Sequence, residues 1–154
     1  MTKIEQALNK LGITLPTKND PVAQYLPCRR EGDLLLISGQ TCKWNGELVY
    51  SGAVGHDITV EEGVKAAELC ALNLLLQVKV FCKGDLGRLV SCVKLTVFVN
   101  SRPDFKDHPV VANGASELLV KCLGDAGRHA RSTVGVCSLP GSASVEIEGV
   151  FKIT

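Results

Sequence analysis

The sequence has little net charge and few aromatic residues. Its 154 residues include 17 Lys and Arg against 16 Asp and Glu, and Phe, Trp and Tyr together make up 5%. Basic residues are scattered, and only Arg29 and Arg30 are adjacent. Nucleic-acid binding calls for a basic stripe along the phosphates, and binding of single strands commonly adds aromatic rings that stack on bases. We therefore expect no nucleic-acid partner.

Long apolar runs and a secretory leader are also missing. The longest apolar runs are much shorter than the roughly 20 residues of a membrane-spanning helix. Residues 1–6 are polar and charged early, whereas a secretory signal begins basic and then turns apolar. The sequence predicts a cytoplasmic protein with no membrane partner. An organellar protein that has lost its transit peptide stays open as an alternative.

Seven cysteines are present, but their spacing matches none of the usual metal-binding or redox motifs. They stand at positions 28, 42, 70, 82, 92, 122 and 137, so no two are separated by two residues. Their number is odd, and several lie inside apolar runs. We interpret them as small buried hydrophobic residues in a reducing compartment, in preference to disulfides or a zinc site. The sequence predicts no metal.

Composition and length predict an ordinary folded protein. Hydrophobic residues make up 45% and charged residues 21%, and the length suggests one domain over residues 1–154. Within it, residues 1–20 are expected to form an N-terminal helix and a connector. The helix would cover residues 3–11, where apolar residues recur at helical spacing, and would pack against the outside of a sheet.

Alternating and helical patterns predict the order β-β-α-β-α-β-β after that helix. Asn45-Gly46 indicates a hairpin turn. Thr59 and Glu62 form a capping box that starts a helix running to about Cys82. A second helix begins near Asp107, and Gly114 inside it costs about 1 kcal/mol relative to Ala, which suggests close backbone packing. The strands are expected at 34–40, 48–50, 89–99, 132–137 and 145–153.

This order predicts an α+β fold, a single mixed β-sheet with two helices packed on one face. The other sheet face also carries Val, Leu and Ile, and no further element is left to cover it. We therefore expect that face to be buried against other copies of the chain.

Arg131 opens one C-terminal strand, and Glu146 lies on the next strand, fifteen positions later. A two-strand hairpin would bring them to the same end of the sheet. An arginine and a carboxylate together suit the binding of a small acid and the handling of a proton or a water. Spacing alone leaves another interpretation open, a surface arginine paired with Glu146 or Glu148.

The segment Ala130-Arg131-Ser132-x-Val134-x-Val136-x-x-Leu139-Pro140, then five residues and Glu146-Ile147-Glu148, resembles the C-terminal signature of the YjgF/RidA family of reactive intermediate deaminases. Upstream, Tyr25 stands thirteen residues before Ser38-Gly39-Gln40, the separation that this family shows. The resemblance covers about residues 20–154. It implies a chorismate-mutase-like fold assembled as a homotrimer, with sites between subunits.

The resemblance also implies a reaction, the hydrolysis of 2-imino acids and their enamine tautomers to 2-keto acids and ammonia. No metal or cofactor is implied. Arg131 would bind the substrate carboxylate and Glu146 would hold the hydrolytic water. The residues that the resemblance places around the substrate are Tyr25, Ser38, Asn113 and Thr133, although Asn113 is offset by one residue and Thr133 stands where many members have cysteine.

Two other functions stay open. The same pocket would serve a non-catalytic trimer that binds small carboxylates or keto acids, and the change from cysteine to Thr133 keeps this alternative. Ribonuclease activity ranks last, because the chain shows neither a paired-histidine arrangement nor a basic groove. His129 replaces a proline that the family usually has two residues before the arginine. We expect His129 to lie at the rim without a role.

Overall fold

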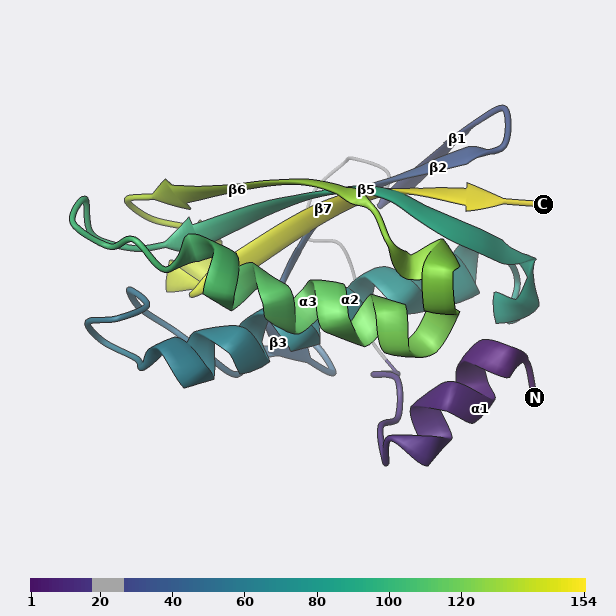
Figure 1. Ribbon diagram of the computed structural model, residues 1–154, viewed down its shortest axis with the longest axis horizontal. Coiled ribbons are helices and arrows are strands. Elements are labelled where there is room, and N and C mark those ends of the chain that lie inside the picture. The colour runs from purple at the N-terminus through teal and green to yellow at the C-terminus, as the bar shows by residue number, and fades with distance from the viewer. Residues whose placement is uncertain (18–26) are drawn as a thin grey trace.

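The computed structural model describes residues 1–17 and 27–154. A five-stranded mixed sheet is covered on one face by two long helices, α2 (Val60–Phe81) and α3 (His108–Leu123) (Figure 1). The fold class predicted from the sequence is therefore confirmed. No helix in these two segments is both long and apolar enough to cross a membrane.

The strand order in the sheet is β1-β2-β7-β5-β6. Strands β5 and β6 are parallel, and the other neighbours are antiparallel. Helix α3 makes the crossover between the two parallel strands, as a β-α-β connection requires. The strands are β1 (Cys28–Glu31), β2 (Leu34–Thr41), β5 (Leu89–Asn100), β6 (Ala130–Val136) and β7 (Val145–Ile153).

Smaller elements fill the connections. The predicted Asn45-Gly46 turn joins β3 (Lys43–Trp44) to β4 (Glu47–Leu48), a separate two-stranded ribbon in which both turn residues have positive φ. The strand expected at 48–50 is therefore wrong as a member of the main sheet, where β1 pairs with β2 instead. The 3-10 turns are η1 (Leu86–Arg88), η2 (Gly124–Gly127) and η3 (Pro140–Ser142). The sequence did not predict β1, because its residues Cys-Arg-Arg-Glu lie on an exposed edge and show no apolar alternation.

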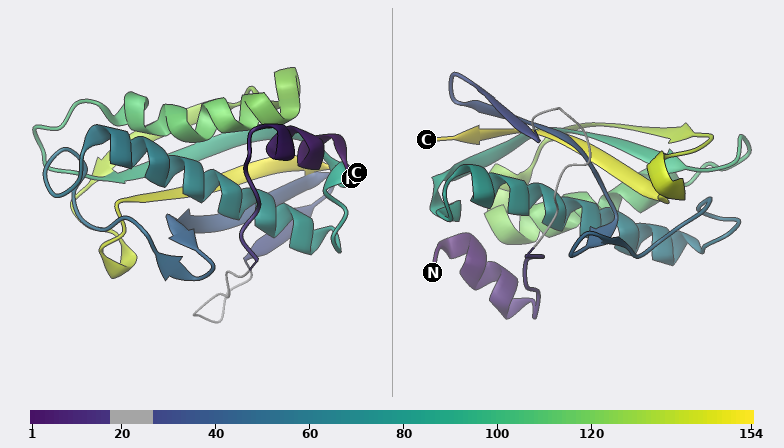
Figure 2. Two further views of the ribbon diagram at one scale, coloured as in Figure 1. Left: turned by 90° about the horizontal axis from the view of Figure 1, so that it is seen from below. Right: turned by 180° about the vertical axis from the view of Figure 1, so that it is seen from behind.

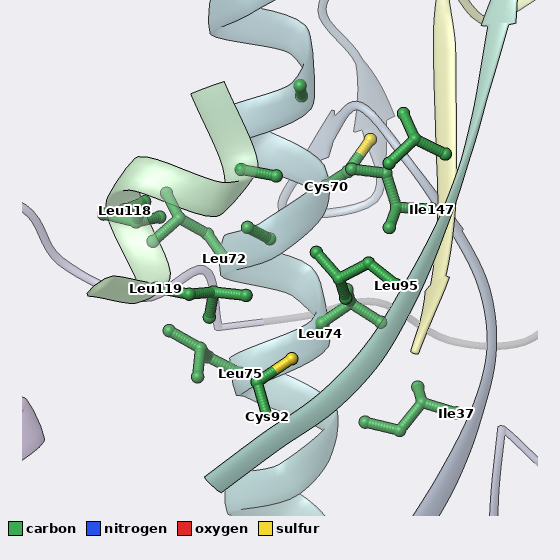
Figure 3. Close-up of a cluster of buried hydrophobic side chains, with 14 of the residues drawn as sticks. Ile37, Cys70, Leu72, Leu74, Leu75, Cys92, Leu95, Leu118, Leu119 and Ile147 are labelled. Carbon is green, nitrogen blue, oxygen red and sulfur yellow. The ribbon is translucent and has the colours of Figure 1, made fainter. Parts of the chain in front are cut away.

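The core lies between the helices and the sheet (Figure 3). Along β7 every second residue from Val145 to Ile153 is buried on the face that packs against α2, which is the period-2 pattern of a half-buried strand. Helix α2 begins as predicted, because Thr59 Oγ1 accepts the Glu62 backbone N–H at 3.1 Å and the Glu62 side chain accepts the Thr59 N–H at 3.4 Å.

Gly114 lets α3 approach α2 closely. A Cβ atom built at Gly114 would overlap the carbonyl oxygen of Val64. Across the same contact, a Cβ at Gly63 would lie 3.3 Å from a methyl group of Val111. Both glycines are buried, so the close backbone packing expected at Gly114 is observed.

Helix α1 (Lys3–Lys10) packs on the helical layer, so the expectation that it would lie against the sheet is wrong (Figure 2). Its buried residues Ile4 and Leu8 belong to the main core. Lys79 of α2 donates a hydrogen bond to Glu5 at 2.7 Å, and this contact together with the Thr2 cap lowers the pKa of Glu5 to about 2. The apolar face of an amphipathic helix can pack against any apolar surface, whether of a sheet or of helices. Here α2 and α3 supply that surface.

Candidate functional site

Arg131 lies on β6 and its side chain points to the helical side of the sheet. Its register partner on β5 is Leu95, which is fully buried beneath the helices. The NH1 nitrogen of Arg131 donates to Asn113 Oδ1 at 2.9 Å and to Ser116 Oγ at 3.1 Å, both on α3. Residues three apart lie on one helix face, so Asn113 and Ser116 form a pair of acceptors that fixes one end of the guanidinium group.

Two more residues complete this group. His129 Nε2 lies 2.9 Å from Ser116 Oγ, and His129 Nδ1 lies 2.7 Å from the carbonyl oxygen of Gly127. Thr133 lies on the same face of β6 as Arg131, and its Oγ1 is buried without a hydrogen-bond partner in the described part of the chain. We call Asn113, Ser116, His129, Arg131 and Thr133 the arginine cluster.

The arginine cluster contains the predicted residues Arg131, Asn113 and Thr133, but the sequence analysis missed Ser116 and gave His129 no role. The spacing of Asn113 and Ser116, three residues apart on a predicted helix, is the signal that could have identified Ser116. No local pattern links α3 to β6, so the contact between them appears only in the fold.

Glu146 lies on the opposite face of the sheet. It alternates with the buried Val145 and Ile147, and its neighbours across the strands are Thr41 on β2 and Phe98 on β5. The register of β2 against β7 shifts between Ile37 and Gln40.

Gly39 lies at this irregularity and leaves room for the Glu146 carboxylate. A Cβ atom at Gly39 would overlap that carboxylate. Ser38, immediately before Gly39, is anchored through its backbone N–H to the carbonyl of Pro27 at 2.9 Å. Ser38 is therefore next in the chain to the glycine that lies against Glu146, and we call Ser38, Gly39 and Glu146 the glutamate cluster.

The environment of Glu146 makes ionisation of its carboxyl group less favourable than in water. Partial burial is the main cause and the like charge of Glu148 is the second, and together they raise the pKa of the Glu146 carboxyl above its ordinary value. A carboxylate with a raised pKa is a stronger base, which suits it to accept a proton from water near neutral pH.

Arg131 and Glu146 do not meet within one copy of the chain. The predicted β6–β7 hairpin is wrong, because β5 lies between these two strands. The two side chains also point to opposite faces of the sheet, which excludes a direct ion pair between them. Tyr25, another predicted site residue, lies outside the described residues.

Five of the seven cysteines are buried and have a structural role. Cys42, Cys70, Cys82, Cys92 and Cys122 are buried, Cys28 is half-buried and Cys137 is exposed, and all seven thiols are free. Burial raises the pKa of Cys28 and of Cys92 to about 12 and that of Cys122 to about 11. These three thiols stay protonated at neutral pH, and the interpretation as small buried hydrophobic residues is confirmed for the five.

Comparison with known proteins identifies relatives over nearly the whole chain. The family model described as "YjgF/chorismate mutase-like, putative endoribonuclease" matches residues 5–147. Protein TCP17 of Trypanosoma cruzi is 40% identical over 98% of this chain and 94% of its own. A 2-iminobutanoate/2-iminopropanoate deaminase of Dermatophagoides farinae is 25% identical over 92% of this chain and 94% of its own.

A solved structure shows the same fold. The protein Atu1372 of Agrobacterium tumefaciens, described as having unknown function, superposes with a TM-score of 0.92 at 45% identity, covering 99% of this chain and 93% of that one. The same arrangement of sheet and helices therefore occurs in a relative solved by crystallography.

Proposed function

Because this chain belongs to the YjgF/chorismate-mutase-like family, we propose that it hydrolyses 2-imino acids to 2-keto acids and ammonia. The relative from Dermatophagoides farinae carries the name of such a deaminase. The observation that carries the proposal is the arginine cluster, in which a guanidinium group is held at one nitrogen and leaves its other donors for a carboxylate.

Arg131 binds the substrate carboxylate. The two N–H groups of its NH1 nitrogen point to Asn113 and Ser116, so Nε and NH2 remain. Within residues 1–17 and 27–154, neither Nε nor NH2 of Arg131 has a hydrogen-bond partner. Nε–H and one N–H of NH2 form a parallel pair of donors that matches the two oxygens of a carboxylate.

Glu146 positions and deprotonates the attacking water. Water adds to the imine carbon C2 while one of its protons passes to Glu146, which then delivers that proton to the imine nitrogen. The resulting carbinolamine transfers its hydroxyl proton to the nitrogen, the C2–N bond breaks, ammonia leaves, and the C2–O group becomes the ketone. Overall one imine and one water give one 2-keto acid and one ammonia. Correct placement of water and imine is a sufficient source of acceleration for this reaction.

The complete site requires more than one copy, since Arg131 and Glu146 point to opposite faces of the sheet. We propose a homotrimer in which the arginine cluster of one subunit faces the glutamate cluster of the next. The face that carries Glu146 is left open by the described residues and has exposed apolar side chains among its polar ones, with Leu36 44% exposed on β2 and Val134 45% exposed on β6. Exposed apolar patches of this kind favour association.

The test is ammonia release from freshly generated 2-iminopropanoate by wild type, Arg131→Ala and Glu146→Gln, with Glu148→Gln as the matched carboxylate control. Loss of a charge-assisted carboxylate clamp should lower kcat/KM about 100-fold or more in Arg131→Ala. Glu146→Gln should lower kcat, whereas Glu148→Gln should keep the wild-type kcat at a pH above the acid limb, where Glu146 is deprotonated in both proteins. Ammonia release by wild type no faster than in buffer, across several imino acids, would exclude the deaminase activity.

A non-catalytic carboxylate-binding trimer is the second candidate. It is favoured by Thr133, which has a hydroxyl in place of a thiol and whose buried Oγ1 has no hydrogen-bond partner among the described residues. Titration with 2-oxobutanoate distinguishes it, because that candidate binds the keto acid without any turnover of the imine. Ribonuclease activity stays last, since His56, His108 and His129 each contact a different partner, Arg102, Ser101 and Ser116 respectively, and form no acid–base pair.

A further inference from the structure

We infer that His129 is a positioning residue that, through Ser116, fixes the guanidinium group of Arg131 for carboxylate binding. The inference deepens the proposed function and rests on its assignment of Arg131 as the carboxylate-binding residue. It concerns two side chains, Ser116 and His129, that lie behind Arg131 and do not reach the substrate.

The direction of each hydrogen bond follows from the chemistry of the groups. The carbonyl oxygen of Gly127 can only accept, so His129 Nδ1, 2.7 Å away, carries a proton. In the neutral ring Nε2 is then an acceptor. The hydroxyl of Ser116, 2.9 Å from Nε2, must donate to it.

This assignment decides what the Ser116 oxygen offers to Arg131. With its proton directed at His129, the hydroxyl presents its lone pairs to Arg131 NH1, which donates at 3.1 Å. The chain of donors therefore runs from Arg131 to Ser116 to His129. Polarisation along such a chain strengthens each bond in it.

The hydrogen bonds of NH1 also determine which edge of the Arg131 guanidinium group meets the ligand. Asn113 and Ser116 accept both N–H groups of NH1, and without Ser116 the guanidinium group would keep only the bond to Asn113. It could then rotate and present NH1 as well. His129 and Ser116 together hold the edge formed by Nε and NH2 toward the substrate.

Three substitutions separate this role from a structural one. His129→Gln places an amide oxygen near the position of Nε2 and keeps the acceptor for Ser116, but it loses the donor to Gly127. His129→Asn keeps a donor near Nδ1 for Gly127 and loses the acceptor. Ser116→Ala removes the link itself, and Glu117→Gln, an exposed change on the same helix, is the control.

Two readouts are needed, the affinity for 2-oxobutanoate by calorimetry and the kinetics with 2-iminobutanoate. Ser116→Ala and His129→Asn should weaken keto-acid binding and raise KM by about tenfold, the range expected for a lost hydrogen bond to a charged group. Their kcat should change little, because the carboxylate is bound equally in the ground and transition states. His129→Gln and Glu117→Gln should stay within about threefold of wild type on the same reasoning.

Near-normal affinity in Ser116→Ala, or normal affinity in His129→Asn together with weak binding in His129→Gln, would overturn the inference. So would equal losses in both histidine variants, or a wild-type protein that does not bind 2-oxobutanoate. If wild type binds the keto acid but does not hydrolyse the imine, the proposed function fails and the affinities alone decide the role of His129.

Discussion

Arg131 and Glu146 lie on opposite faces of the same sheet, on strands β6 and β7, with β5 between them. The strand register shows this separation. Arg131 lies beside Leu95 of β5, which lies beside Gly149 of β7, whereas Glu146 lies beside Phe98 of β5, which lies beside Val134 of β6. In the proposed function, one copy would therefore offer a carboxylate-binding half on the helical side and a water-binding half on the other side. The proposed chemistry requires the two halves to come from different subunits.

Mixing two inactive variants tests this division directly. Arg131→Ala and Glu146→Gln should each be nearly inactive alone. Every mixed trimer keeps one site with an intact arginine from one subunit and an intact glutamate from its neighbour. With random assembly from equal amounts, about a quarter of wild-type activity should return. The measurement is ammonia release after co-expression or joint refolding.

Two controls accompany that mixture. Separately refolded variants combined without subunit exchange should stay inactive, and Arg131→Ala mixed with wild type should lose activity in proportion to the variant. Absence of any recovery, in trimers shown by mass to be mixed, would contradict a site shared between subunits.

As the pH is lowered, activity should be lost at a pH above the ordinary pKa range of a glutamate. Burial and Glu148 raise the pKa of Glu146. The reaction needs the deprotonated carboxylate, so raising its pKa moves the loss of activity to higher pH. The profile of kcat/KM against pH measures this shift. Glu148→Gln removes the like charge and should move the acid limb back to lower pH, whereas a limb that stays unchanged would argue that Glu146 is not the titrating group.

Gly39→Ala should lower turnover while leaving carboxylate affinity largely intact. The added Cβ would overlap the Glu146 carboxylate and displace it from the bulge. Arg131 lies on the other face of the sheet and keeps its contacts with Asn113 and Ser116. We expect kcat to fall at least about tenfold, as for a misplaced catalytic group. Affinity for 2-oxobutanoate serves as the internal control, and an unchanged kcat would remove the role assigned to Gly39.

Gly114→Ala should destabilise the protein, although helix propensity alone favours Ala by about 1 kcal/mol. The new methyl group would overlap the carbonyl oxygen of Val64. Overpacking of this kind costs typically about 1–3 kcal/mol. Denaturant unfolding measures the difference, with the exposed Glu117→Ala on the same helix as the control. A gain in the free energy of unfolding for Gly114→Ala would show that α2 and α3 can move apart at no cost.

Local sequence determined most of the elements. The Thr59–Glu62 box starts α2, the Asn45-Gly46 pair makes the turn between β3 and β4, and alternation from Val145 to Ile153 gives the strand with one buried face. These features act between residues close in the chain, so the pattern itself contains the information. The strand positions and chemistry of Arg131 and Glu146 made them candidate site residues, and the resemblance of the C-terminal segment to a known family implied their roles.

Only the tertiary structure decided which strands are neighbours. Alternation says that β6 and β7 are strands, but it does not say that β5 lies between them, because strand pairing is a contact between distant segments. The same limit hid Ser116 and His129, whose link to Arg131 depends on how α3 packs on β6. The types of the elements follow from local physics, whereas the separation of Arg131 from Glu146 follows from packing of the whole chain.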